Sequence, residues 1–147
     1  MANEFYYCVS LSIVHPTIDP IDISNVISNL QPRIESMAGS ERRTRDGTAV
    51  VPARKVLLSH WLAELHDEER IFSGDEAISD FITGKLRELE GHRDLFSQLG
   101  QEGQVSLVIG WFSESNHSAG VLEAETLKKC GDLGLSVELN YYGPSAV

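Results

Sequence analysis

The side chains able to do acid–base, nucleophilic or metal chemistry are scattered along this sequence. No two histidines are four residues apart, as they are in a helical metal-binding motif. The two cysteines stand in neither a CxxC nor a metal-ligand spacing. No nucleophile-elbow, dinucleotide-binding or P-loop sequence occurs. We therefore expect no catalytic residue, no metal site and no cofactor. These histidines and cysteines are His15, His60, His66, His92, His117, Cys8 and Cys130.

Arginine is concentrated in one stretch of an otherwise acidic chain. The net charge is −10, from 12 basic and 22 acidic side chains, and half of the basic ones lie in residues 33–55, including Arg42, Arg43 and Arg45. A guanidinium group binds carboxylate or phosphate through two hydrogen bonds, so one interpretation is a contact with an anion or an acidic peptide. The alternative, which we favour, is an exposed loop whose arginines pair with the acidic body.

The two tryptophans, Trp61 and Trp111, each lie at the end of a predicted strand. Anchoring in the core is the usual role of tryptophan in such a position. If both approach the same end of the sheet, they line a shallow pocket with His117 and the arginine-rich stretch. The candidate binding residues are therefore Arg42, Arg43, Arg45, His60, Trp61, Trp111 and His117.

The excess of acidic side chains disfavours two classes of partner. Nucleic acids and anionic membranes both require clustered lysine and arginine. No apolar run approaches the roughly 18 residues of a membrane span, and the first residues lack the basic segment of a signal peptide. We expect a cytoplasmic protein that binds neither nucleic acid nor membrane.

Periodicity predicts the first half of the chain as a strand, a helix and a second strand. Alternating apolar residues predict a strand over 5–14, with Tyr7, Val9, Leu11 and Ile13 on one face. Asp19 and the proline after it are typical of a helix start, and the helix is expected to end at about residue 30. Residues 33–53 are expected to form a loop or a short exposed strand, 54–62 a strand, and 63–74 a loop or short helix.

The second half is predicted as two helices and two strands. Ser73 and Glu76 have the spacing of a capping box, and an apolar stripe follows over 78–89, interrupted at Gly91. A strand over 105–112 is expected to be covered on both faces. A helix over 123–131, with Leu127 and Cys130 inward, is expected to end at Gly134. The last strand is 135–142.

The alternation in the last strand places Leu135, Val137 and Leu139 on its packed face. The order of elements predicts an α+β fold, in which an antiparallel or mixed sheet of about four or five strands carries helices mainly on one face. This is a two-layer sandwich of the ferredoxin-like kind. We expect one domain over 1–147, with 143–147 as a short tail.

Several of these segments together resemble the bacterial family catalogued as domain of unknown function 4279. The resemblance lies in the segment Thr17-Ile18-Asp19-Pro20 after an alternating strand, in His60-Trp61 and in the closing segment from Leu127 to Tyr142. It covers most of the chain and is strongest at both ends, whereas 33–53 departs from it. The resemblance implies an α+β fold and a cytosolic bacterial protein, but no activity and no catalytic residues.

Three functional hypotheses follow. The first is a non-catalytic module that binds another protein, for example as an immunity-type neutraliser of a basic toxin, because an acidic surface steers basic partners. The second is a dimerising scaffold in which a sheet edge or the face of Tyr142 pairs with a second copy. The third is a small-molecule-binding protein or small enzyme with a pocket near Trp61 and Trp111.

Overall fold

The fold is built around its first strand. The computed structural model describes residues 4–40, 48 and 56–144. Within them β1 (Tyr6–His15) pairs antiparallel with β3 (Ser59–Glu64), with β5 (Gln104–Phe112) and, at its start, with β4 (Ile71–Phe72). The alternation of apolar residues in β1 confirms its prediction, because Tyr7, Val9, Leu11 and Ile13 are all buried.

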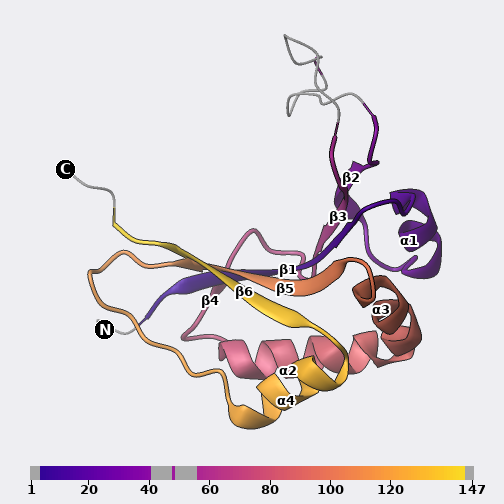
Figure 1. The fold of residues 1–147 in the computed structure, drawn as a ribbon. Helices are drawn as coiled ribbons and strands as arrows, with labels where there is room; N and C mark the ends of the chain where they lie inside the picture. Colours follow the sequence, from indigo (N-terminus) through magenta and orange to yellow (C-terminus); the bar gives the residue numbers. More distant parts are fainter. Residues whose placement is uncertain (1–3, 41–47, 49–55, 145–147) are drawn as a thin grey trace.

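Two further strands complete one open sheet with the order β2-β3-β1-β5-β6 (Figure 1). The short strand β2 (Pro32–Ser36) lies antiparallel to β3, and β6 (Ser136–Tyr142) lies parallel to β5. A parallel neighbour needs a crossover, which α4 (Ala124–Asp132) supplies. The predicted mixed α+β two-layer arrangement is therefore confirmed.

The helices cover one face of this sheet, which we call the helix face. They are α1 (Pro20–Val26), α2 (Ile78–Leu89) and α3 (Arg93–Gly100), besides α4, and a short 3₁₀ turn, η1 (Glu90–His92), separates α2 from α3. Figure 1 shows α2, α3 and α4 beneath the sheet. The predicted stripe of α2 packs into this core, with Leu86 and Leu89 among its buried residues, and the interruption expected at Gly91 is confirmed.

The opposite, open face carries small residues at its centre. Ser10, Ser12 and Ser106 lie there on adjacent strands, and Val108 beside them is half-buried. No helix of the described residues packs on this face. The expected cover of β5 on both sides is therefore met only in part, because Ser106 and Gly110 are buried there whereas Val108 and Phe112 are half-buried.

Two helix ends differ from their predictions. Helix α1 ends at Val26, not near residue 30, because Ile27 leaves the helical region with φ −94° and ψ 63°. Helix α2 begins at Ile78 after Ala77, without a side-chain cap. Ser73 does not cap it, because its hydroxyl instead accepts a hydrogen bond from the backbone N–H of Phe5 at 2.9 Å.

The end of α4 follows its prediction. Gly134 has a φ of +75°, a conformation that glycine adopts at no steric cost. The backbone N–H of Leu135 donates to the carbonyl of Cys130 at 2.9 Å, and that of Gly134 donates to Gly131 at 3.0 Å. These two bonds form a Schellman motif, which turns the chain from α4 into β6.

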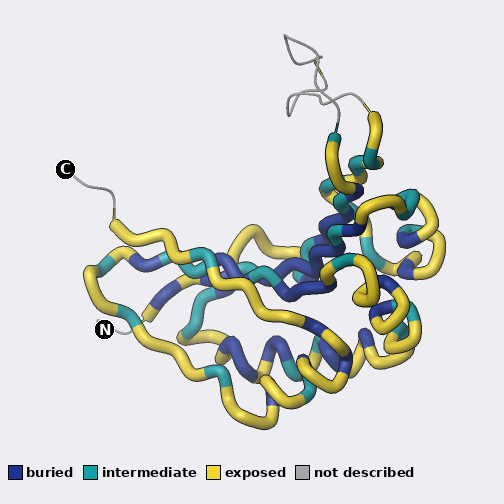
Figure 2. Tube along the Cα trace, in the orientation of Figure 1, coloured by how far each residue is buried: buried dark blue, intermediate teal, exposed yellow. Residues whose placement is uncertain are grey.

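The final strand is less covered than its alternation predicts. Leu135 is buried, but Val137, Leu139 and Tyr141 are 37%, 57% and 54% exposed. Figure 2 shows exposure along most of β6. The register with β5 places these three residues on the helix face, yet at the edge of the sheet, beyond the core that the helices cover. Leu127 of α4 is also exposed, contrary to prediction, whereas Cys130 is buried.

Candidate functional site

The structure separates the residues that the sequence suggested as binding candidates. Arg42, Arg43 and Arg45 lie outside the described residues. His60 is half-buried on the open face, where its Nε2 lies 3.2 Å from the hydroxyl of Ser12. His117 is exposed in the segment between β5 and α4, where its carbonyl accepts a hydrogen bond from the Ser115 hydroxyl.

Trp61 is a core residue. It lies on the helix face of β3 and is fully buried. Its indole N–H donates to the hydroxyl of Ser24 in α1 at 2.9 Å, and that hydroxyl donates in turn to Glu35 of β2 at 2.5 Å. Burial and a satisfied N–H show that Trp61 fastens α1 to the sheet.

Trp111 lies elsewhere in the fold. It is half-buried, its ring stacks on Phe5 with centroids 3.6 Å apart, and its indole N–H donates to Ser118 at 2.9 Å. Along β1, Trp61 pairs with Ile13 whereas Trp111 pairs with Tyr7, a separation of about 20 Å at strand spacing. The structure therefore does not bring the two tryptophans together around one pocket.

Neither thiol is activated for nucleophilic chemistry. Burial raises the pKa of the Cys8 thiol, and burial likewise raises the pKa of Cys130. A raised pKa reduces the thiolate fraction that would react. In the part of the chain that the structure describes, no group of three or more histidine, cysteine or acidic side chains is arranged to hold a metal ion.

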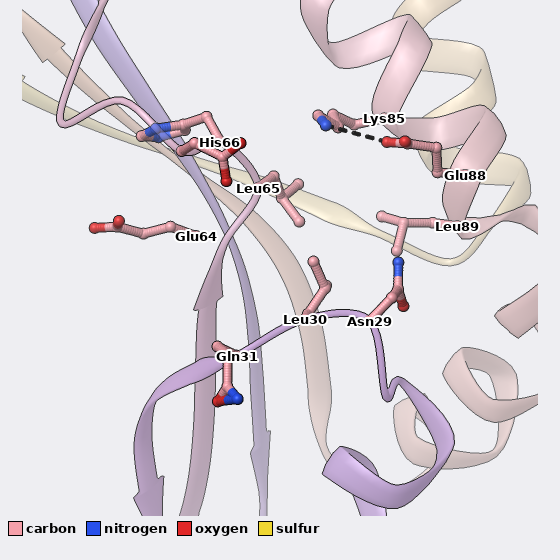
Figure 3. A pocket seen from close by; sticks show the side chains of 10 residues that line it. Asn29, Leu30, Gln31, Glu64, Leu65, His66, Lys85, Glu88 and Leu89 are labelled. Atoms are coloured by element: carbon pink, nitrogen blue, oxygen red, sulfur yellow. Dashed lines mark ion pairs between the residues drawn. The ribbon is translucent and has the colours of Figure 1, made fainter.

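Within the described residues, a concave surface lies between the loop after β3 and helix α2. Two adjoining hollows of about 460 and 440 Å³ share Leu65, His66, Asp67, Lys85 and Glu88 in their linings, and we call them together the acidic groove. Figure 3 shows Leu30, Leu65 and Leu89 converging at the inner side of the first hollow. The groove therefore has an apolar floor between polar walls.

The walls of the acidic groove carry six carboxylates but only one ammonium group, that of Lys85. Lys85 forms an ion pair with Glu88 at 3.2 Å and lies 5.5 Å from the centre of the Phe81 ring. Glu64 at the outer rim pairs with Arg33 at 2.8 Å. Among the described residues, no ion pair engages the other four acidic side chains. These are Asp67, Glu68, Glu76 and Asp80.

The pKa of Tyr7 reflects the negative potential beside the acidic groove. Its hydroxyl donates to the backbone carbonyl of Glu76 at 2.8 Å. Burial raises the pKa of this phenol, and the nearby carboxylates of Glu76, Asp80 and Glu68 raise it further. The same potential favours an approaching cation.

The acidic groove was not predicted from the sequence. Three of its carboxylates lie in two short acidic runs, at 67–69 and 75–76, and such runs are typical of a solvated surface. Strand β4, which pairs with β1, lies between β3 and α2 in the chain, and residues from both sides of it line the 440 Å³ hollow.

A second cluster was also missed, on the open face. The guanidinium of Arg70 lies 3.8 Å from the centre of the Phe112 ring, and Phe112 stacks on Tyr142 with centroids 4.8 Å apart. These residues come from three separate segments, which alternation within one strand cannot connect. The arrangement is typical of a cation–π contact.

Comparison with known proteins adds no relative. No protein-family model, no curated protein and no solved structure matches the chain. Within the described residues, none of the helices is both long and apolar enough to pass through a membrane.

Proposed function

We propose that the protein is a non-catalytic binding module that holds a basic segment of a partner protein in the acidic groove. One observation carries the proposal: in the part of the chain that the structure describes, four carboxylates without an ion pair line the 440 Å³ hollow, which meets the leucine-lined 460 Å³ hollow at Leu65. A lysine or arginine side chain suits such a surface, because its aliphatic stem packs on leucine while its charged end reaches the carboxylates.

The electrostatics support a partner rather than a substrate. Exposed carboxylates attract a cationic partner over a distance and raise its association rate. The reactive side chains argue against catalysis, since both thiols have raised pKa values and Glu88 is already engaged by Lys85. The small-molecule alternative was tied to Trp61 and Trp111, and no observation favours it.

An immunity-type role is one form of this proposal, in which the module covers a basic surface of a toxin. We place that role in the cytoplasm. Relationship to the domain of unknown function 4279 stays a proposal as well, and it contributes no activity. The acidic groove is thus the feature to test.

The test measures binding of a fluorescent octalysine peptide by anisotropy, with octaglutamate as the comparison peptide. The groove variant is Asp67→Asn combined with Asp80→Asn. The control variant is Asp94→Asn combined with Asp132→Asn, which changes the net charge equally on exposed parts of α3 and α4.

We expect octalysine to bind more tightly than octaglutamate, and binding to weaken with added salt, which screens exposed charges. The groove variant should lose about fivefold in affinity, equivalent to about 1 kcal/mol for two exposed ion pairs. The control variant should lose less than half of that free energy. Equal losses in the two variants would show that only net charge matters and would refute the proposal.

A further inference from the structure

The edge strand β6 carries an apolar surface that the protein itself leaves uncovered. It is the last strand of the sheet on that side (Figure 1). Val137, Leu139 and Tyr141 form a row along it, and each is more than a third exposed. A long exposed edge with apolar residues is a template for pairing with another strand. The row therefore points to an interface, one that is separate from the acidic groove.

The hydrogen bonds of β6 show which backbone groups point outward. The carbonyl of Tyr142 accepts from the backbone N–H of Ser113 at 2.9 Å, so the polar backbone groups of Tyr142 face β5. Because these groups alternate in direction along a strand, those of Asn140 and Glu138 also face β5. The backbone groups of Val137, Leu139 and Tyr141 consequently point away from the sheet, where no strand of the described residues pairs with them.

We propose that the protein forms a homodimer in which two copies of β6 pair antiparallel about a two-fold axis at Leu139. In this register Leu139 meets Leu139 of the second copy, and Val137 meets Tyr141, so that all three outward residues form hydrogen-bonded pairs. A β-branched residue opposite an aromatic one is a favourable cross-strand pair.

Charge supports the same register. Glu138 stands opposite Asn140 of the second copy. Within one chain the amide of Asn140 already donates to Glu138 at 3.1 Å, and the two-fold axis offers the same donor from the other side. Moving the axis by one residue toward the N-terminus would set Glu138 against its own copy, and like charges directly opposite are destabilising. Such a self-complementary patch is what a two-fold interface requires.

The interface also accounts for the exposed row. In the dimer the two sheets become continuous, and the rows of the two copies lie side by side on the helix face. A paired strand of this length is a small interface, and small interfaces belong to weak, reversible assemblies. We therefore expect a dissociation constant in the micromolar range.

Sedimentation velocity at several protein concentrations tests the dimer. The disrupting variant is Leu139→Lys, which sets two ammonium groups against each other at the axis. Leu139 is already 57% exposed, so the monomer should keep its melting temperature. The matched control is Leu57→Lys, at a residue that is 89% exposed and precedes β3 near the other edge of the sheet.

We expect Leu139→Lys to raise the dissociation constant by about tenfold or more, which corresponds to about 1.4 kcal/mol, and Leu57→Lys to leave it unchanged. A wild-type protein that stays monomeric up to millimolar concentration would overturn the proposal. So would a dimer that both variants weaken equally, because its interface would then lie elsewhere.

Cysteine cross-linking tests the register. In a background of Cys8→Ser and Cys130→Ala, the variant Leu139→Cys brings two Cα atoms to about 5.5 Å, within disulfide reach. Val137→Cys is the matched control on the same edge, because its two copies stand about 13 Å apart in this register. We expect rapid oxidation to a covalent dimer for Leu139→Cys only. Preferential cross-linking of Val137→Cys would overturn the register.

Discussion

The imidazole Nε2 of His66 accepts a hydrogen bond from the backbone N–H of Val9 at 3.1 Å. Strand β3 ends at Glu64, and the N–H of Leu65 still donates to the Val9 carbonyl at 2.9 Å. The side chain of His66 thus replaces the next backbone acceptor of the ladder. Its Nδ1 contacts the carbonyl of Glu68, so the neutral ring with the proton on Nδ1 satisfies both groups. This histidine fixes one wall of the acidic groove.

Replacing His66 tests that role. His66→Ala removes the acceptor of the Val9 N–H in a buried part of β1, and an unpaired buried amide costs about 1–3 kcal/mol. His66→Gln keeps an acceptor oxygen at a similar reach and should retain most of the stability. Urea denaturation measures the free energy of unfolding of both variants. A loss as large for His66→Gln as for His66→Ala would contradict the replacement of a ladder acceptor.

Acid should destabilise the fold through His60. Burial lowers the pKa of this imidazole, and the carboxylate of Glu138 opposes the shift only in part. The unfolded chain keeps the ordinary value of about 6.5, so it binds a proton more readily than the folded protein. The contribution of His60 to stability is therefore full above pH 6.5 and is lost as the pH falls through the lower folded value.

Comparing the wild-type protein with His60→Gln isolates the contribution of His60 to the pH dependence of the unfolding free energy. Between pH 7.5 and pH 5.5, the wild-type protein should lose more unfolding free energy than His60→Gln, which cannot take up the proton. His117→Gln, at an exposed site, should follow the wild-type profile. Urea denaturation at the two pH values gives the comparison, and parallel profiles for wild type and His60→Gln would contradict it.

The same glycine-to-alanine substitution should have opposite effects at two positions. A Cβ at Gly103 would lie 2.3 Å from the carbonyl oxygen of Val14 and 3.0 Å from the Cα of His15. These are backbone atoms of β1, so Gly103→Ala forces the residue before β5 away from the end of β1 and should cost about 1–3 kcal/mol. Gly84 lies exposed inside α2, and its added Cβ meets nothing within 4 Å. Gly84→Ala should stabilise by about 0.5–1 kcal/mol, because alanine favours the helix. Thermal and urea unfolding measure both effects, and a stabilising Gly103→Ala would contradict the close approach.

The sequence was sufficient where a residue's neighbours in the chain determine its environment. Alternation placed Val9 and Leu11 on one buried face, and the helical stripe placed Leu86 in the core. It was insufficient where a distant segment decides. Alternation predicts that Val137 and Leu139 share a face. Whether a helix extends over that face depends on where α4 lies, and no local sequence pattern determines that position.

The candidate site likewise depends on segments that are distant from one another in the chain. The acidic runs at 67–69 and 75–76 are separate in the sequence, and the two-residue strand β4, which pairs with β1, lies between them in the chain. A two-residue strand carries too little periodicity to be predicted. The capping box predicted at Ser73 fails for a related reason. Its spacing to Glu76 matches the motif, but its hydroxyl accepts a hydrogen bond from the backbone N–H of Phe5, which is 68 residues away in the chain.

The two tryptophans offer a final contrast, because each indole N–H donates to a serine hydroxyl at 2.9 Å. Ser24→Ala leaves the N–H of the fully buried Trp61 without a partner, which should cost about 1–3 kcal/mol. Ser118→Ala should cost under about 1 kcal/mol, since Trp111 is only half-buried and water can replace the hydroxyl. Urea unfolding followed by tryptophan fluorescence measures both losses. Equal losses would mean that the Ser24 hydroxyl does not anchor α1 to the sheet, and that packing of Ile23 and Ile27 alone holds that helix in place.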